Sequence, residues 1–228
     1  MAMIPPAAAD EGNPTAISIN ATLSTIVSSR MVIINTNDQQ LQQQGAALTP
    51  QQPLQQHGIE CSLHTLPKPL LREFDHVFGQ KYNTNREIVV GGSKSQLVEL
   101  LAIPTNQHAR EDIVGVGIHI EEEKDRLLRV FMAFASEFCN KIRSLGYWSD
   151  YMDPCSGLPM LTPDCNKVYS EVDGMEVLLG YRTYDAGFCK ILTHPKWGSA
   201  VYPSTIFANA PKSVVKKILE SYPTAATK

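Results

Sequence analysis

The chain has 228 residues, a net charge of −3 at pH 7 and hydrophobic residues at 43% of its positions. This length holds one well-packed domain, or one domain with a tail. The acidic balance argues against nucleic acid as a partner, because neutralising phosphates requires a basic surface. No apolar run in the sequence approaches the roughly 20 residues that a membrane-spanning helix needs.

The N-terminal sequence and the cysteines predict an intracellular protein. Residues 1–14 (MAMIPPAAADEGNP) have no basic segment ahead of an apolar core, so a secretory signal is not expected. The first arginine is Arg30, and the acidic Asp10 and Glu11 come early, which disfavours a mitochondrial presequence. The five cysteines are odd in number and form no CxxC pair, so we expect neither a zinc ribbon nor a thioredoxin-type site.

Residues 1–57 are predicted to be a disordered tail and a Gln-rich linker. Ala, Pro, Ser and Thr dominate the start, and residues 39–56 are rich in Gln and interrupted by prolines. Such a polar tract buries too little apolar surface to offset the entropy lost on ordering. One apolar patch, Met31–Ile34, is a candidate short strand on the core. The folded domain is expected to span residues 58–228.

Apolar periodicity predicts the elements that follow. Ile59, Cys61 and Leu63 alternate with polar residues, which is typical of a half-buried strand. The apolar residues of Leu70–Phe78 share one helical face, and Gly79 stands where a glycine ends a helix.

Three short segments precede the longest helix. Glu87–Val90 and Val114–Ile120 are predicted to be strands, the second with its alternating apolar residues facing inward. Leu97–Ile103 fits either a strand or a helix, and we expect Pro104 to end it.

The longest predicted helix is Glu121–Leu145. Its apolar residues recur at steps of three and four and form a stripe of core width. Acidic residues at its start, and Lys141 and Arg143 in its last turn, suit the helix dipole. Gly146 marks its end.

The C-terminal third is predicted to hold strands and one helix. Strands are expected near Leu178–Tyr184, Cys189–His194 and Ser204–Ala208, followed by a helix from Pro211 through Leu219. Strands and helices are mixed without regular alternation, which favours an α+β sandwich over a doubly wound parallel sheet.

We find no standard catalytic motif. Gly91–Ser95 resembles a phosphate loop but lacks the GxxxxGK[ST] spacing, so a polar turn is expected. Gly115–Gly117 lies within a predicted strand, which excludes a dinucleotide loop. The six histidines show no HxxxH or HExxH spacing. Only His194, between a strand and the aromatic Trp197, is kept as a candidate for lining a site.

Two segments, GYWSDYMDPCSGLP from Gly146 and GFCKILTHPKWGSAVYPSTIFANA from Gly187, combine aromatic residues with Gly and Pro. Rigid rings on loops shaped by Gly and Pro are a common way to build a binding surface. The rings expected to contact a partner are Tyr147, Trp148, Tyr151 and Trp197. The alternative is that both tryptophans belong to the core.

The cysteines divide into core and loop residues. Cys139 lies in the long predicted helix and is expected to be buried. Cys155 and Cys165 lie in Pro-rich loops and are candidate exposed thiols. Cys189 precedes Lys190, whose charge would favour a thiolate, and the alternative is a buried strand position.

The segments GYWSDYMDPCSGLP, GFCKILTHPKWGSAV and STIFANA, in this order after a long helix, carry a specific resemblance. Together with CSLHTLPKPLLREFDHVFG they resemble the methylmalonic aciduria and homocystinuria type D family, the CblD proteins of intracellular vitamin B12 trafficking. The resemblance is continuous from about Ile59 to the C-terminus and leaves the Gln-rich tail uncovered.

The resemblance implies a function and a fold. Family members look like flavin nitroreductases in fold but act as non-enzymatic adapters. They bind the CblC protein, which removes the upper ligand of cobalamin, and the cofactor then reaches methionine synthase in the cytosol or methylmalonyl-CoA mutase in mitochondria. We therefore expect cobalamin only in complex with a CblC-type protein, and a cytoplasmic or also mitochondrial location. The alternatives are a flavin-dependent oxidoreductase of nitroreductase type and a scaffold unrelated to cobalamin.

The chain departs from the family at one position. A family cysteine in the pattern Gly-Cys-Cys-Lys can supply a sulfur ligand to the cobalt of CblC-bound cobalamin. Here the sequence reads Gly187-Phe188-Cys189-Lys190, with Phe188 where that thiol is expected. Three outcomes stay open: Cys189 is the ligand, Cys155 is the ligand, or no cobalt–sulfur bond forms. Neighbours in a strand point to opposite faces, so Cys189 would need a local twist to reach the same place.

Overall fold

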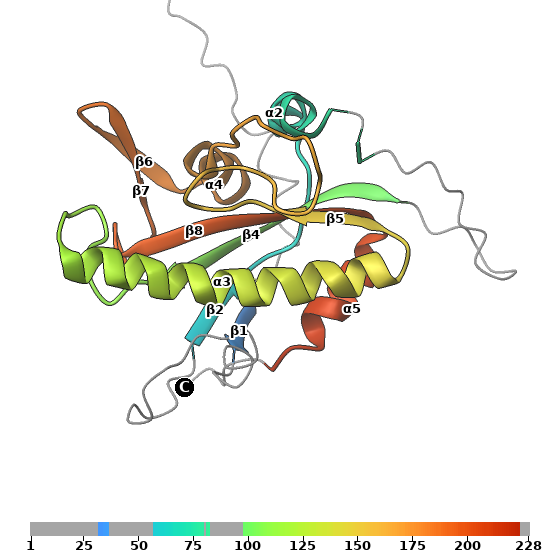
Figure 1. Ribbon diagram of the computed structural model, residues 1–228, viewed down its shortest axis with the longest axis horizontal. Helices are drawn as coiled ribbons and strands as arrows, with labels where there is room; N and C mark the ends of the chain where they lie inside the picture. Colours follow the sequence, from blue (N-terminus) through green and yellow to red (C-terminus); the bar gives the residue numbers. More distant parts are fainter. Residues whose placement is uncertain (1–31, 37–56, 80, 83–97, 224–228) are drawn as a thin grey trace, which may run out of the picture.

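The computed structural model describes residues 32–36, 57–79, 81–82 and 98–223. The predicted strand Glu87–Val90, the predicted turn Gly91–Ser95 and most of the predicted tail lie outside these residues. The described chain builds an antiparallel sheet with helices on both faces (Figure 1). The predicted α+β class is therefore confirmed.

The main sheet has six strands in the order β1-β2-β4-β8-β5, and the short β3 also pairs with β4. All of its pairs are antiparallel. Its centre is the long pair of β4 and β8, ten residues each, which runs in register from Glu99 opposite Ala210 to His108 opposite Val201. The strand bounds are β1 Val32–Thr36, β2 His57–Cys61, β3 His64–Thr65, β4 Glu99–His108, β5 Trp148–Tyr151 and β8 Val201–Ala210.

Four described helices cover the two faces. Helices α3 (Ile118–Ser144) and α5 (Lys212–Glu220) share one hydrophobic core with the sheet, and α2 (Lys68–Phe78) and α4 (Glu171–Leu179) share the other (Figure 1). A separate hairpin of β6 (Arg182–Ala186) and β7 (Cys189–Thr193) follows α4.

Each face of the sheet is packed by aromatic rings. Phe131, Phe134 and Phe138 of α3 are fully buried against one face. On the other face the Trp148 ring lies 5.0 Å from Phe78, edge to face, which is a favourable aromatic geometry. These two cores hold the sheet rigid between the helices.

Most predicted elements are confirmed in place. The strand through Ile59, the helices at α2, α3 and α5, and the strands at β7 and β8 all form, with bounds that differ by a few residues. The candidate strand at Met31–Ile34 corresponds to β1, which pairs with β2.

The predicted strand Val114–Ile120 is wrong. Residues 109–117 form turns and bends, and α3 begins at Ile118. Val116 is 95% exposed, so the apolar residues do not face inward together. The alternation of Val with Gly imitates a strand, but this segment pairs with none of the strands that the structure describes. Ile120 alone turns into the core, as part of the helical stripe.

Pro104 does not end its element, as we expected; it lies in the middle of β4. The Pro104 carbonyl accepts a hydrogen bond from the Ser62 N–H at 3.3 Å, in the break between β2 and β3. In an antiparallel strand the N–H and the C=O of one residue point to the same side. A backbone N–H at position 104 would therefore also point toward the break between β2 and β3. No ladder bond is therefore lost.

The predicted strand Leu178–Tyr184 is only partly correct. Residues through Leu179 belong to α4, and β6 begins at Arg182. The Ser170 Oγ accepts a hydrogen bond from the Asp173 N–H and caps the helix. Gly180, with φ +65°, ends it.

Candidate functional site: the β6–β7 hairpin

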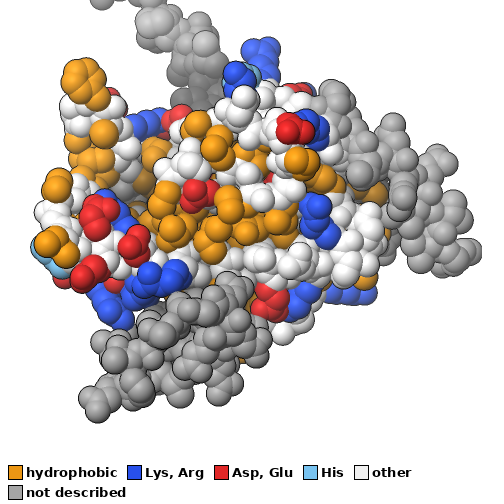
Figure 2. Space-filling model, viewed as in Figure 1, with side chains coloured by type: hydrophobic (Ala, Val, Ile, Leu, Met, Phe, Trp, Pro, Cys, Tyr) orange, Lys and Arg blue, Asp and Glu red, His pale blue; other side chains and the backbone are white. Residues whose placement is uncertain are grey.

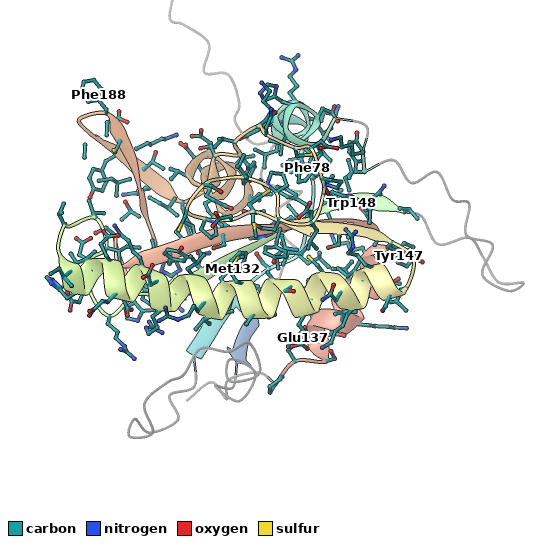
Figure 3. All side chains as sticks on the ribbon, viewed as in Figure 1. Phe78, Met132, Glu137, Tyr147, Trp148 and Phe188 are labelled. Carbon is teal, nitrogen blue, oxygen red and sulfur yellow. The ribbon has the colours of Figure 1, made fainter. Side chains whose placement is uncertain are left out.

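The β6–β7 hairpin projects from the body of the molecule, and Phe188 stands at its tip (Figures 1 and 3). Ala186 pairs with Cys189, so Gly187 and Phe188 form a two-residue turn. Gly187 has φ +64° at the first position of the turn, which is the requirement of a type II′ hairpin turn. The Phe188 side chain is fully exposed. A fully exposed phenylalanine on a tight turn is unusual and marks the tip as a candidate contact site.

One face of the hairpin is fixed to the body. Lys190 Nζ lies 2.7 Å from Asp173 Oδ1 and 2.5 Å from Glu176 Oε2, both on α4. These two hydrogen bonds raise the pKa of Lys190. Leu192, two positions on, is buried against Met175 of α4 in the same small cluster. The arm is thus held in one orientation at α4.

The base of the hairpin is anchored by a buried pair of His194 and Glu60. His194 Nε2 lies 3.2 Å from Glu60 Oε2, and both side chains are buried. The N–H groups of Lys196 and Trp197 donate to His194 Nδ1, so the proton of the neutral ring resides on Nε2, facing Glu60. Burial lowers the pKa of His194, and the carboxylate of Glu60 opposes this shift. His194 is therefore a positioning residue of the arm.

The opposite face of the hairpin points away from the body. Tyr184 and Ile191 are paired across the strands, and Tyr184 is 48% exposed. Cys189, paired with Ala186 two register positions nearer the tip, lies on this same face and is exposed. The alternative of a buried Cys189 is wrong. Tyr184 was not among the residues predicted to contact a partner. Arg182, Tyr184 and Ala186 occupy alternate positions of one strand, and this spacing could have shown that they share a face.

The thiols differ in access. Burial raises the pKa of Cys139 and that of Cys61 to about 12, and both side chains are fully buried, as predicted for Cys139. Cys155 is exposed but lies on the loop after β5, with its Sγ 3.8 Å from the Tyr202 hydroxyl. The structure does not bring it together with Cys189 in any described contact.

The aromatic residues expected to contact a partner do not form one surface. Trp148 and Tyr151 are 6% and 5% exposed and belong to the two cores. Tyr147 and Trp197 are half-buried. The Trp197 ring stacks on His194 at 3.9 Å between centroids. The alternative that Trp148 belongs to the core is therefore correct. Partner binding by the exposed parts of Tyr147 and Trp197 stays a prediction.

The hairpin offers a single soft ligand rather than a complete metal site. Among the residues that the structure describes, no three His, Cys, Asp or Glu side chains converge as metal ligands. None of the described helices is long and apolar enough to cross a membrane. A lone thiol on a projecting arm is suited to reach a metal ion that another molecule holds, because thiolate is a soft ligand.

Comparison with known proteins places the chain in a family. A family described as methylmalonic aciduria and homocystinuria type D protein matches residues 14–219. The chain belongs to this family. The match starts upstream of Ile59, so our expectation that the resemblance leaves the Gln-rich tail uncovered is wrong.

Curated relatives bear the name cobalamin trafficking protein CblD. The human protein is 32% identical over 162 residues, which cover 71% of this chain and 50% of the relative. The mouse protein is 30% identical over 162 residues, or 70% of this chain and 50% of the relative. The chicken protein is 31% identical over 152 residues, or 67% and 47%. The chain thus spans about half the length of these relatives. The flavin-dependent alternative finds no support in these comparisons.

Proposed function

We propose that the protein is a non-enzymatic adapter in cobalamin trafficking that presents the β6–β7 hairpin to a CblC-type protein. Membership of a family whose curated members are named for cobalamin trafficking supports the pathway. The observation that carries the proposal is the exposed tip of an anchored arm, with Phe188 on the turn and Cys189 beside it.

The hairpin suits insertion into a partner. Its ion pairs to α4 and its buried base fix the arm before binding, so little conformational entropy remains to be lost. A phenylalanine ring buries a large area with few rotatable bonds. Gly187 has open space around it, which lets another molecule approach the backbone closely.

We propose Cys189 as the thiol that reaches the cobalt of partner-bound cobalamin. Cys189 is exposed and adjoins the tip, whereas Cys155 lies on a separate loop against Tyr202. Lys190 points to α4 and its charge is engaged by two carboxylates. Lys190 is therefore not free to stabilise a thiolate at Cys189. Coordination to a soft metal ion would do so instead. Phe188 and Gly187 would line the contact beside it.

Cobalt spectroscopy tests this assignment. The cobalamin-loaded CblC-type protein is mixed with wild type, Cys189→Ser or the matched control Cys155→Ser, and the absorption and electron-spin spectra are recorded. We expect wild type and Cys155→Ser to shift the cobalt bands and Cys189→Ser to leave them unchanged. An unshifted spectrum for wild type, in a mixture that elutes as a complex, would show docking without a cobalt–sulfur bond.

We also propose that the protein has a nitroreductase-like fold and does not bind the flavin cofactor of nitroreductases. The antiparallel sheet covered by helices on both faces is compatible with that fold. We expect the isolated protein to bind neither flavin nor free cobalamin at micromolar concentration. Titration followed by flavin fluorescence and cobalamin absorbance checks this, and tight flavin binding would restore the oxidoreductase alternative. The proposed location is the cytoplasm, with mitochondria as a second site.

A further inference from the structure

A buried amide without a protein partner lies beside the pair that anchors the β6–β7 hairpin. Asn106 is 1% exposed, and neither its Oδ1 nor its Nδ2 has a hydrogen-bond partner within the described part of the chain. Exchanging the two amide atoms does not alter this, because both are without a partner. Buried side-chain amides in folded proteins are nearly always paired, either with protein groups or with ordered water. Asn106 is therefore expected to bind a molecule from outside the chain.

The sheet fixes the surroundings of this amide. Asn106 lies on β4, the middle one of three neighbouring strands, directly opposite Glu60 of β2 and Pro203 of β8. Opposite residues of an antiparallel pair point to the same face, with Cβ atoms about 5 Å apart. Alternate positions of β4 share a face, and Ala102 packs in the core of α2 and α4. The Asn106 amide and the Glu60 carboxylate therefore lie side by side on the face that α4 covers.

This layer of the molecule is closed. Glu60 and His194 are both buried, and the Trp197 ring that stacks on His194 packs against the buried cluster of Met175 and Leu192. Figure 2 shows hydrophobic side chains gathered at the centre of the face seen there, between α4 and α3. A molecule bound at the amide is therefore shielded from bulk solvent and exchanges slowly with it.

Neighbouring protein donors are already engaged. The Nε2–H of His194 faces Glu60 Oε2 at 3.2 Å. Thr205, two positions along β8 from Pro203 and on the same face, donates its N–H and its hydroxyl to Glu171 at 3.0 and 2.5 Å. Pro203 itself has no N–H. A carboxylate accepts at both oxygens, so Glu60 Oε1 is a further acceptor beside the amide.

We propose that Asn106 and Glu60 bind an ordered water molecule that joins β4 and β2 to the base of the hairpin. The water accepts a hydrogen bond from Asn106 Nδ2 and donates one to Glu60 Oε1. A molecule that both donates and accepts suits an amide next to a carboxylate, and water is small enough for a packed interior. An anion would be repelled by Glu60. The site belongs to the isolated protein and does not depend on the proposed function.

Nuclear magnetic resonance of the full-length chain tests the site. The side-chain NH₂ protons of Asn106 should show cross-relaxation with water of the sign that marks a long-lived bound molecule. The matched control is Asn209, at the other end of the β4–β8 pair, whose Nδ2 donates to the Tyr82 carbonyl at 3.2 Å. Its NH₂ protons should show no signal of that sign. A missing water signal at Asn106 would show a dry amide and overturn the proposal.

Hydrogen exchange tests the link from this water to the hairpin. Asn106→Leu keeps the branched shape of the side chain and removes both polar atoms. Without the water, the Glu60–His194 pair is held less firmly, so the N–H groups of Lys196 and Trp197, which donate to His194, should exchange about threefold faster.

Asn209→Leu is the matched variant and should leave the exchange of these two N–H groups unchanged. Exchange in Asn106→Leu equal to that of wild type would contradict the proposal, because the water would then join nothing to the hairpin. If Asn106→Leu does not fold, the water signal at Asn106 in wild type decides alone.

Discussion

The fixed shape of the loop after β5 depends on one buried carboxylate, and its removal has a calculable cost. Asp150 Oδ1 accepts from the N–H groups of Tyr151, Met160 and Leu161 at 2.7, 3.1 and 2.8 Å, and Oδ2 accepts from Thr162 at 2.7 Å. Asp150→Asn keeps one acceptor oxygen and turns an NH₂ toward the other donors. It loses at least one charge-assisted hydrogen bond, worth ~1.5–3 kcal/mol.

Asp150→Ala costs more because it leaves donors without partners. The bonds to Tyr151 and Thr162 are fully buried, and each unsatisfied N–H costs ~1–3 kcal/mol, giving ~2–6 kcal/mol in total. The donors of Met160 and Leu161 are partly exposed and recover water. Asp153→Asn is the matched control, since its bonds to Cys155 and Ser156 are exposed and its loss should stay below ~1 kcal/mol.

Urea unfolding with a common slope measures these differences in the free energy of unfolding. We expect the order of stability wild type, Asp153→Asn, Asp150→Asn, Asp150→Ala. If Asp150→Asn unfolds within ~0.5 kcal/mol of wild type, or if Asp153→Asn costs as much, the hydrogen bonds do not hold the loop as described.

The remaining predictions concern ionisation and thiol access. Burial raises the pKa of Glu171 in the folded state to about 8, so the folded state binds more protons than the unfolded state above pH 4.5. The contribution of Glu171 to stability should therefore fall as pH rises from about 5 to 8, so urea unfolding should show Glu171→Gln gaining stability relative to wild type over this range. A slope equal to wild type in Glu171→Gln would refute the shift. Cys155 and Cys189 should react rapidly with a thiol reagent in the folded protein, whereas Cys61 and Cys139 should react only on unfolding. Cys165 is only partly buried, so it is also replaced in the test: fast modification of Cys61 or Cys139 in a Cys155→Ser, Cys165→Ser, Cys189→Ser triple variant would contradict this.

The periodicity of apolar residues predicted the elements that bury one face and expose the other. The α3 stripe and the β7 strand were predicted because one face of each is buried and the other is exposed. Strand β5 was not predicted as a strand. Its residues are buried on both faces of the sheet, with Trp148 in one core and Tyr151 in the other, so no alternation is visible.

The site was predictable in position but not in accessibility. The segment around Gly187 was singled out by composition, and the structure places Phe188 and Cys189 at an exposed tip. The sequence could not show that Trp148 is buried, because burial there depends on contacts with α2, which lies about 70 residues earlier in the chain. The partners of Asp150 were equally hidden, since backbone N–H groups carry no sequence signature.

Complex formation is the measurement that tests the central proposal most directly. Equal amounts of the full-length chain and the CblC-type protein are sedimented together, with detection at the absorbance of protein and of cobalamin. We predict a single heavier species that carries cobalamin, and a smaller fraction of that species for Phe188→Ala than for wild type. Two separately sedimenting proteins, with all cobalamin on the partner alone, would contradict the adapter function.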